Sequence, residues 1–126
     1  MKLYKTKWVS RFARRERLAD RSLAEAIARA ERGLIDADLG GGLIKQRVAR
    51  SGQGRSGGYR MLVAFRSADR AVFLYGFAKS EQENISPDEL VTLREIAASW
   101  LAADVQGIAR AIAENALEEV PYDEEG

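Results

Sequence analysis

The residues best suited to chemistry gather in one basic stretch, residues 40–60, which contains no carboxylate. Its cations are Lys45, Arg47, Arg50, Arg55 and Arg60. Two apolar-containing runs, residues 43–49 and 59–65, are joined by a link rich in glycine and serine, which predicts a β-hairpin with a basic loop. Lys45 and Arg47 stand two residues apart and therefore point to the same face of a strand. The stretch predicts a surface that can hold phosphate.

The absent residue types narrow the possible chemistry. The chain has neither histidine nor cysteine, so the Ser/His/Asp and Cys/His sets of nucleophilic enzymes are excluded, together with thiolate metal sites. The Gly-x-Gly of residues 52–54 lacks the rest of a dinucleotide fingerprint, and a strand rather than a helix is expected after it. We therefore expect no metal and no cofactor.

A set of lysines, arginines and tyrosines can still cleave RNA, because RNA carries its own nucleophile, the 2′-hydroxyl. The protein has to align this hydroxyl with the phosphorus, take its proton and stabilise charge on the phosphate oxygens. Arginine matches those oxygens with a planar fork that stays charged, and a lysine crowded by other cations can transfer a proton. The alternative is a hairpin that only binds anions.

Charge is divided unevenly along the chain, although the formal net charge is only +1. Residues 1–79 hold 18 Lys/Arg against 7 Asp/Glu, and residues 80–126 hold 2 against 12. A basic body predicts an anionic partner; the alternative is that the acidic tail lies against the body and balances it. No apolar run approaches the length of a membrane span, and the charged N-terminus lacks the apolar core of a signal peptide. We expect a cytoplasmic protein with no membrane partner.

The sequence before the hairpin predicts a strand and two helices. Residues 1–8 alternate like a short strand, which we place at a sheet edge because lysines discourage further pairing there. Helices are expected over residues 9–17 and from Ser22, where Ser22 and Glu25 fit a capping box. The arginines of both helices are expected on solvated faces, with contact to nucleic acid as the alternative, and residues 36–42 are expected to form a turn.

The sequence after the hairpin loop predicts strands and a covering helix. The apolar runs 61–65 and 71–78 are typical of strands covered on both faces, with a bulge or a close approach at Gly76. Ser86 begins a helix that covers the sheet, followed by a further short helix and a loose acidic end at residues 118–126. We expect an α+β domain with an N-terminal strand, a helical hairpin, a three-stranded antiparallel meander and C-terminal helices.

Four motifs in this order resemble the RelE/HigB branch of the RelE/ParE superfamily of type II toxins. They are a Lys-x-Arg at residues 45–47, a Gly/Arg-rich loop, a Gly-Tyr-Arg at residues 58–60 and a Gly-x-x-Lys-x-Glu at residues 76–81. The resemblance covers residues 1–103 and implies a RelE-like domain with a microbial-RNase-like fold. Residues 104–126 would then be an acidic helix and tail that pack on this domain or extend it.

The resemblance implies a toxin that is held inactive by a cognate antitoxin and cleaves ribosome-bound mRNA, leaving a 2′,3′-cyclic phosphate and a 5′-hydroxyl. Operator DNA would be bound only through the antitoxin complex. The residues that match the family's catalytic positions are Lys45, Arg47, Arg60 and Lys79. The basic pair on the first hairpin strand orients RNA and supports proton transfer, Arg60 matches the arginine at the scissile phosphate, and Lys79 lies near the leaving oxygen. The residues expected to bind RNA are Arg50, Arg55 and Tyr59.

The sequence departs from the RelE pattern at two places. Ser80 stands where that family has an arginine, and the final helix of the resemblance, residues 87–103, lacks the family's tyrosine. The identities of the general acid and base therefore stay open. Two alternatives stay open as well: a ParE-like protein that inhibits DNA gyrase without cutting nucleic acid, because one fold can support both functions, and a member without catalysis that only binds its antitoxin.

Overall fold

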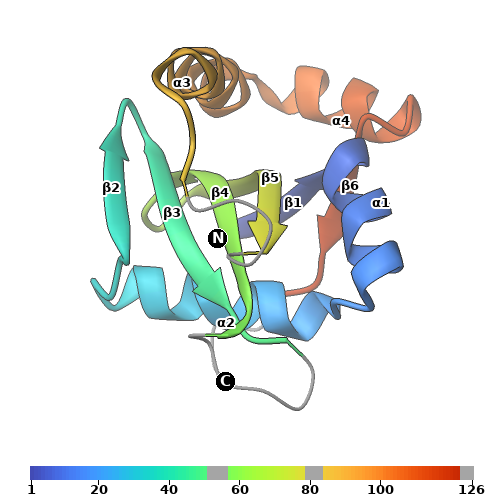
Figure 1. Ribbon diagram of the computed structural model, residues 1–126. Coiled ribbons are helices and arrows are strands. Elements are labelled where there is room, and N and C mark those ends of the chain that lie inside the picture. The colour runs from blue at the N-terminus through green and yellow to red at the C-terminus, as the bar shows by residue number, and fades with distance from the viewer. Residues whose placement is uncertain (51–56, 79–83, 123–126) are drawn as a thin grey trace.

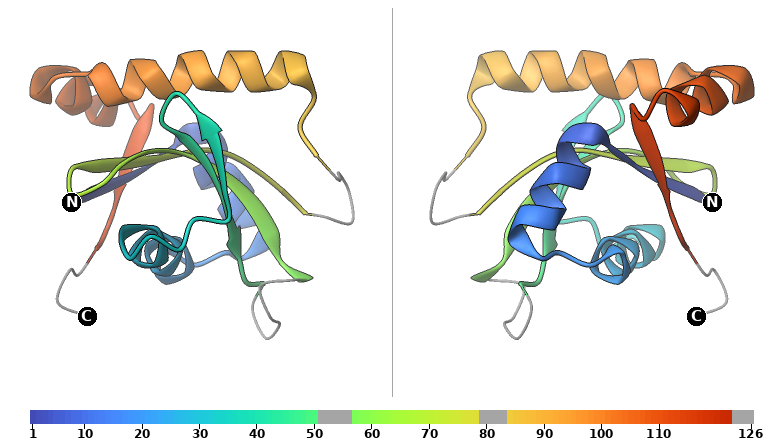
Figure 2. Two further views of the ribbon diagram at one scale, coloured as in Figure 1. Left: turned by 90° about the vertical axis from the view of Figure 1, so that its left-hand side faces the viewer. Right: turned by 90° about the vertical axis from the view of Figure 1, so that its right-hand side faces the viewer.

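The computed structural model describes residues 1–50, 57–78 and 84–122. In this part of the chain six strands form one mixed sheet in the order β2-β3-β4-β5-β1-β6. Helices α1 and α2 cover one face of the sheet, and α3 and α4 cover the other (Figure 1, Figure 2). The α+β class predicted from the sequence is confirmed. The elements in chain order are β1 (Lys2–Thr6), α1 (Lys7–Glu16), α2 (Asp20–Glu31), β2 (Ala37–Gly40), β3 (Leu43–Val48), β4 (Tyr59–Arg66), β5 (Arg70–Ala78), α3 (Pro87–Ala102), α4 (Val105–Ala113) and β6 (Leu117–Val120).

The sheet separates two apolar clusters, because successive side chains of a strand point to opposite faces. Leu62 and Val63 are neighbours on β4 and both are fully buried, Leu62 on the α3/α4 face and Val63 on the α1/α2 face. Burying a side chain of this size contributes about 1.5–3 kcal/mol to stability. The prediction that the strands after the hairpin loop are covered on both faces is therefore confirmed.

Three of the helices described here begin at side chains that accept a backbone hydrogen bond, which satisfies a donor in the first turn. Thr6 caps α1 through its hydroxyl oxygen, at 3.3 Å from the backbone nitrogen of the third residue after it. Ser86 and Glu89 form the reciprocal capping box at the predicted start of α3. Asp104 caps α4 through a 2.7 Å hydrogen bond, so the further short helix predicted after α3 is present.

β1 lies inside the sheet, and its predicted position at an edge is wrong. It pairs in parallel with β5 and antiparallel with β6. Lys5 is only 8% exposed, and its Nζ lies 2.7 Å from a carboxylate oxygen of Asp20 and 3.1 Å from one of Glu118. Burial lowers the pKa of Lys5, but the hydrogen bonds and charges of the two carboxylates raise it by more, so the net shift is upward. The lysine in β1 therefore does not indicate an edge strand, because two carboxylates compensate its charge inside the sheet.

The contact between Asp20 and Lys5 also bears on where the second helix begins. α2 begins at Asp20 and not at the predicted Ser22. A carboxylate in the first turn is stabilised by the helix dipole, and Asp20 also binds Lys5 on β1. The tertiary contact outweighs the capping pattern that Ser22 and Glu25 offer in the sequence.

Two strands were not predicted. β2 occupies the region expected to be a turn, and it pairs antiparallel with β3, with Ala37 opposite Lys45. β6 occupies the start of the region expected to be loose, and it pairs antiparallel with β1. Leu117 and Val120 at its ends are buried, while the two glutamates between them are exposed. The acidic composition of the tail hid these two apolar positions, which are sufficient to add a strand to a sheet edge.

A β-bulge interrupts the ladder between β4 and β5. Leu62 is opposite Tyr75 and Val63 is opposite Phe73, so Leu74 is the extra residue. The side chains of Leu74 and Tyr75 both pack in the cluster on the α3/α4 face. The bulge thus lies next to the predicted Gly76, where the expected close approach is also found, since a Cβ at this position would overlap the sulfur of Met61.

Candidate functional site

The hairpin of β3 and β4 carries the predicted site, and its register brings three cations to one face. Arg47 is directly opposite Arg60, and Lys45 is opposite Leu62. Ile44 and Val48 point to the α1/α2 cluster, so Lys45 and Arg47 between them point to the α3/α4 face. Directly paired residues of neighbouring strands share a face, and Arg60 therefore lies on the same side. We call Lys45, Arg47 and Arg60 the hairpin cation set.

Arg60 is the most unusual member of this set. It is half-buried, and its Nη1 atom is buried without a hydrogen-bond partner among the residues that the structure describes. Its directly paired residue on β5 is Phe77, a buried ring, so the Arg60 side chain leaves the sheet beside an apolar residue. Buried guanidinium nitrogens are almost always paired, and a low-dielectric neighbourhood strengthens any hydrogen bond they make. This arrangement suits an anion with exposed oxygens, such as a phosphate.

Arg47 is already engaged by an acid that the sequence places outside the hairpin. Asp36 accepts a 2.7 Å hydrogen bond from the Arg47 backbone N–H, and its other oxygen lies 3.2 Å from Nη2 and 3.3 Å from Nε of the same arginine. Burial raises the pKa of Asp36, but the hydrogen bonds and charge of Arg47 lower it by more, with a further lowering by Arg29. The Arg47 side chain stays 46% exposed, so it can still meet a ligand while Asp36 holds it.

The hairpin rests on a buried polar network that the sequence did not predict. Arg29 of α2 is 5% exposed, which corrects the expectation that the helix arginines lie on solvated faces. It donates to the backbone oxygen of Arg47 and to both Asp36 and Glu25. Gln46 is fully buried and accepts a 2.7 Å hydrogen bond from the Asp36 backbone N–H. The network fixes β3 to α2 and thereby fixes the register of the hairpin cation set.

Tyr59 and Arg50, both predicted to bind RNA, lie in a different environment. Tyr59 points to the α1/α2 face and is 2% exposed. Its hydroxyl donates to Glu16 at 2.9 Å and accepts from Arg50 Nε at 3.1 Å, and the Arg50 guanidinium lies 5.0 Å from the ring centroid. Burial, and then the hydrogen bond to Glu16, raises the pKa of Tyr59. These contacts give Tyr59 a structural role at the base of the hairpin, on the opposite face of the sheet from the Arg60 side chain.

Two predicted site residues, Arg55 and Lys79, lie outside the described residues, so their roles stay predictions. The described part of the acidic tail consists of α4, β6 and the two residues after β6; α4 packs mainly against β6, which lies at the opposite edge of the sheet from β2 and β3. It therefore does not cover the hairpin cation set. No group of three or more His, Cys, Asp or Glu residues able to hold a metal ion occurs within residues 1–50, 57–78 and 84–122.

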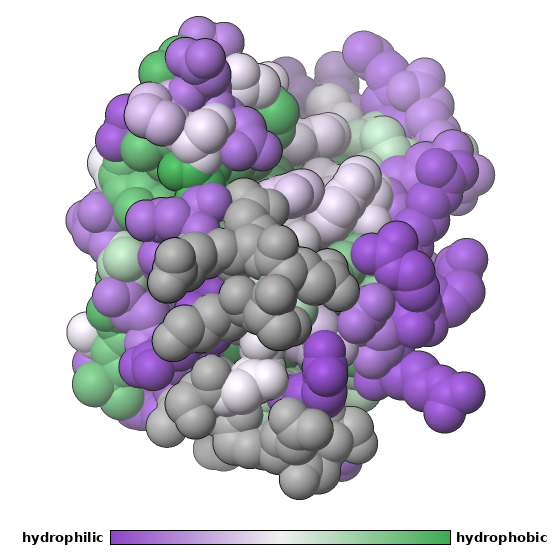
Figure 3. Space-filling model, viewed as in Figure 1, coloured by the Kyte–Doolittle hydropathy of each residue, from purple (hydrophilic) through white to green (hydrophobic). Residues whose placement is uncertain are grey.

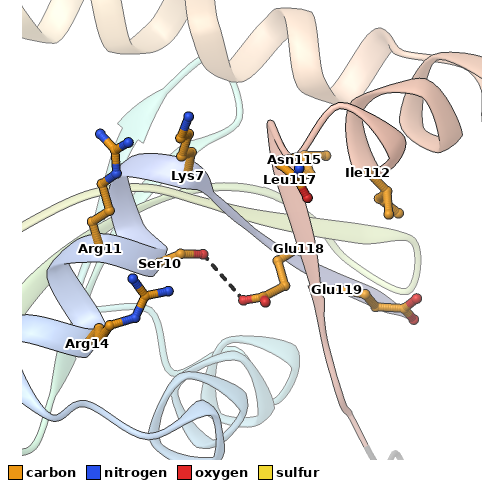
Figure 4. A pocket seen from close by; sticks show the side chains of 9 residues that line it. All are labelled: Lys7, Ser10, Arg11, Arg14, Ile112, Asn115, Leu117, Glu118 and Glu119. Carbon is orange, nitrogen blue, oxygen red and sulfur yellow. Dashed lines mark hydrogen bonds between the residues drawn. The ribbon is translucent and has the colours of Figure 1, made fainter.

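A second charged region lies between α1 and β6. A cavity of about 430 Å³ separates Lys7, Arg11 and Arg14 on α1 from Glu118 and Glu119 on β6 (Figure 4). The hydroxyl of the α1 serine between these cations lies 3.4 Å from a Glu118 carboxylate oxygen. Hydrophilic side chains gather on this side of the molecule, over α1 (Figure 3). The α1 cations were expected to be solvated, and the structure shows that they also border a hollow.

The fold and the hairpin cation set agree with one class of small α+β toxins. The family model described as "RelE toxin of RelE / RelB toxin-antitoxin system" matches residues 1–120. The chain therefore belongs to the RelE toxin family, and it is a toxin of a toxin–antitoxin system whose partner is an antitoxin. No curated protein matches the sequence. None of the helices that the structure describes is both long and apolar enough to cross a membrane.

Proposed function

We propose that this toxin is a metal-independent endoribonuclease that cleaves mRNA at the ribosome. The observation that supports the proposal most directly is the buried Nη1 of Arg60, which has no partner among the described residues. It lies opposite Arg47 and on the same face as Lys45. A protein that only had to fold would gain nothing from an uncompensated guanidinium nitrogen there, whereas a phosphate would supply the missing acceptor once the Arg60 side chain turns toward it.

The proposed reaction breaks one phosphodiester bond and needs no external nucleophile. The 2′-oxygen of the RNA attacks the adjacent phosphorus, its proton leaves, and the bond from phosphorus to the 5′-oxygen breaks as that oxygen gains a proton. The products are a 2′,3′-cyclic phosphate and a 5′-hydroxyl. Arg60 would neutralise the charge that grows on the phosphate oxygens. Lys45 would assist proton transfer, Arg47 would orient the RNA from its fixed position on Asp36, and Lys79 would stand near the leaving oxygen.

Primer extension on a translated mRNA tests the proposal. The wild type is compared with Arg60→Ala and with Arg21→Ala, which removes an exposed arginine from α2. We expect cuts only when ribosomes are present, their loss in Arg60→Ala, and their retention in Arg21→Ala. The 5′ ends of the products should accept a labelled phosphate without prior phosphatase treatment, as a 5′-hydroxyl requires.

The primer-extension result also distinguishes the proposed nuclease from the other functions that this fold can support. Cuts of equal strength without ribosomes would remove the ribosome from the proposal and keep the nuclease. The absence of cuts under both conditions would overturn the nuclease. A supercoiling assay with DNA gyrase would then decide between a ParE-like inhibitor and a toxin that only binds its antitoxin.

A further inference from the structure

Trp8 is a large aromatic side chain that stays 42% exposed at the start of α1. Its ring is held on two sides. It stacks on Phe12, one helical turn later, with ring centroids 5.3 Å apart and an interplanar angle of 13°. It also packs against Tyr75 of β5, at 4.5 Å and 38°. The ring therefore has a fixed position and still presents part of its surface to water.

The Trp8 ring is connected to the hairpin cation set through other aromatic rings. The bulge at Leu74 places Tyr75 on the α3/α4 face, and the centroid of its ring lies 6.2 Å from that of Phe77. Phe77 is directly opposite Arg60 in the β4–β5 ladder. A continuous row of rings thus leads from the surface at Trp8 to the residue proposed to bind the scissile phosphate.

Two exposed cations are near neighbours of Trp8 on α1, and both also border the cavity opposite Glu118 and Glu119. Lys7 precedes Trp8 in the chain, and Arg11 follows one turn later on α1. Both side chains are exposed, and neither makes a side-chain hydrogen bond or ion pair within the part of the chain that the structure describes. Figure 4 shows both extending to one side of α1 and away from Glu118. They are therefore available for an anionic ligand at this end of α1.

We propose that Trp8 is a stacking platform for a nucleobase of single-stranded RNA, with Lys7 and Arg11 binding the adjoining phosphates. Proteins that bind single-stranded nucleic acid combine aromatic rings for the bases with cations along the backbone. A single exposed apolar side chain is ordinary on a protein surface. The combination of a fixed ring, a row of aromatics leading to Arg60 and two cations that have no side-chain partner among the described residues is what points to a base. RNA is the ligand because the proposed function makes RNA the substrate, and the platform rests on that proposal.

Fluorescence provides the direct test, because the chain contains only two tryptophans, Trp8 and Trp100. In Trp100→Phe, Trp8 is the only source of tryptophan emission. The probe is a short single-stranded RNA with 2′-O-methyl groups, which keeps its bases and cannot be cleaved by 2′-hydroxyl attack. We expect it to quench Trp8, and we expect an abasic oligonucleotide of equal length to leave the emission unchanged. Equal quenching by both oligonucleotides, or binding of the RNA without quenching, would overturn the platform.

Binding measurements with Trp8 variants supply the second test. Trp8→Leu keeps an apolar side chain between Phe12 and Tyr75 but offers no ring, and we expect it to weaken RNA binding about tenfold. Trp8→Phe should restore most of the affinity, and the abasic oligonucleotide should bind all three proteins alike. Lys7→Gln should reduce the slope of log affinity against log salt by about 0.7. An unchanged RNA affinity in Trp8→Leu would contradict the proposal.

The outcomes keep the platform and the proposed function apart. If the 2′-O-methyl RNA binds and quenches Trp8 but no mRNA is cut, the nuclease is wrong and the platform stands. If mRNA is cut and Trp8→Leu binds and cuts like the wild type, the nuclease stands and the platform is wrong.

Discussion

Two arginines near the hairpin, Arg29 below β3 and Arg60 on β4, differ in how their guanidinium groups are satisfied. Arg29 is almost fully buried and donates to Glu25 at 3.1 Å, to Asp36 at 3.4 Å and to the backbone oxygen of Arg47. Arg60 is half-buried, and its Nη1 has no acceptor within the described residues. The buried donors of Arg29 therefore have acceptors within the protein, whereas one buried donor of Arg60 has none among the described residues.

The difference distinguishes an arginine that supports the fold from one that is a candidate for function. A buried donor without an acceptor costs about 1–3 kcal/mol, whereas removing one member of a satisfied buried ion pair costs about 3–5 kcal/mol. Removal of Arg29 should therefore destabilise the fold, whereas removal of the Arg60 Nη1, which lacks a partner in the part of the chain that the structure describes, should not. Variants of the two arginines should change different observables, and the predictions below test this separation.

The largest expected effect is on catalysis. Arg60→Ala should reduce the rate of RNA cleavage about a thousandfold, as the loss of one transition-state donor does, and should leave the free energy of unfolding within about 1 kcal/mol of the wild type. Single-turnover cleavage and urea unfolding measure the two quantities. A variant that cuts RNA normally would remove Arg60 from the site, and a variant that does not fold would remove the contrast with Arg29.

The next effect is on stability. Arg29→Met keeps much of the side-chain volume but removes the donors to Asp36 and to the Arg47 backbone oxygen. We expect it to lower the free energy of unfolding by about 3 kcal/mol. Urea unfolding measures the loss, and Arg32→Met, an exposed neighbour on the same segment, is the matched control. Equal stability of the two variants would show that the buried network does not hold the hairpin.

A variant of Lys45 tests whether the hairpin cation set also transfers a proton. Lys45→Ala should lower the cleavage rate about a hundredfold if the amine acts as acid or base, and it should change the shape of the pH–rate profile. Stability should change little, because Lys45 is only half-buried. A reduced rate with an unchanged profile would restrict Lys45 to binding the phosphate backbone.

The smallest effect concerns Asp36, the acid that contacts both Arg29 and Arg47. The pKa of Asp36 is lowered in the folded protein, so its carboxylate stabilises the fold above its ordinary pKa of about 4 and loses that contribution as the pH falls through the lowered value. Asp36→Asn should be less stable than the wild type by about 1.5 kcal/mol at pH 6. The difference should shrink at pH 3 in urea unfolding. A difference that does not depend on pH would mean that charge is unimportant at this position.

The sequence predicted the hairpin and α3 well, because both depend on short-range signals. The strands of the hairpin follow from two runs around a glycine-rich link, and α3 begins after Ser86, the helix cap that the sequence predicts. The face shared by Lys45 and Arg47 follows from strand geometry alone. That Arg60 would lie opposite Arg47 needs the register, which the family motifs imply but the residue types do not.

Other features could not be predicted because they depend on contacts between distant segments. β1 lies inside the sheet only because β6 returns to pair with it, and Lys5 is tolerated there only because Asp20 and Glu118 meet it. Arg29 shows the same limit, since its acceptors come from other elements. The sequence did not predict the contact of Trp8 with Tyr75, because that contact depends on a bulge in β5.

The central place of β1 has a consequence for synthesis of the chain. β1 leaves the ribosome before both of its partners, β5, which begins at residue 70, and β6 at residues 117–120. The nascent chain can form the local β3–β4 hairpin early, but it cannot complete the sheet around that hairpin until nearly all of the residues described here are available. Pairing over such long separations is slow, and unpaired strands expose the chain to aggregation in the meantime. The hairpin cation set thus acquires its full support among the last events of folding.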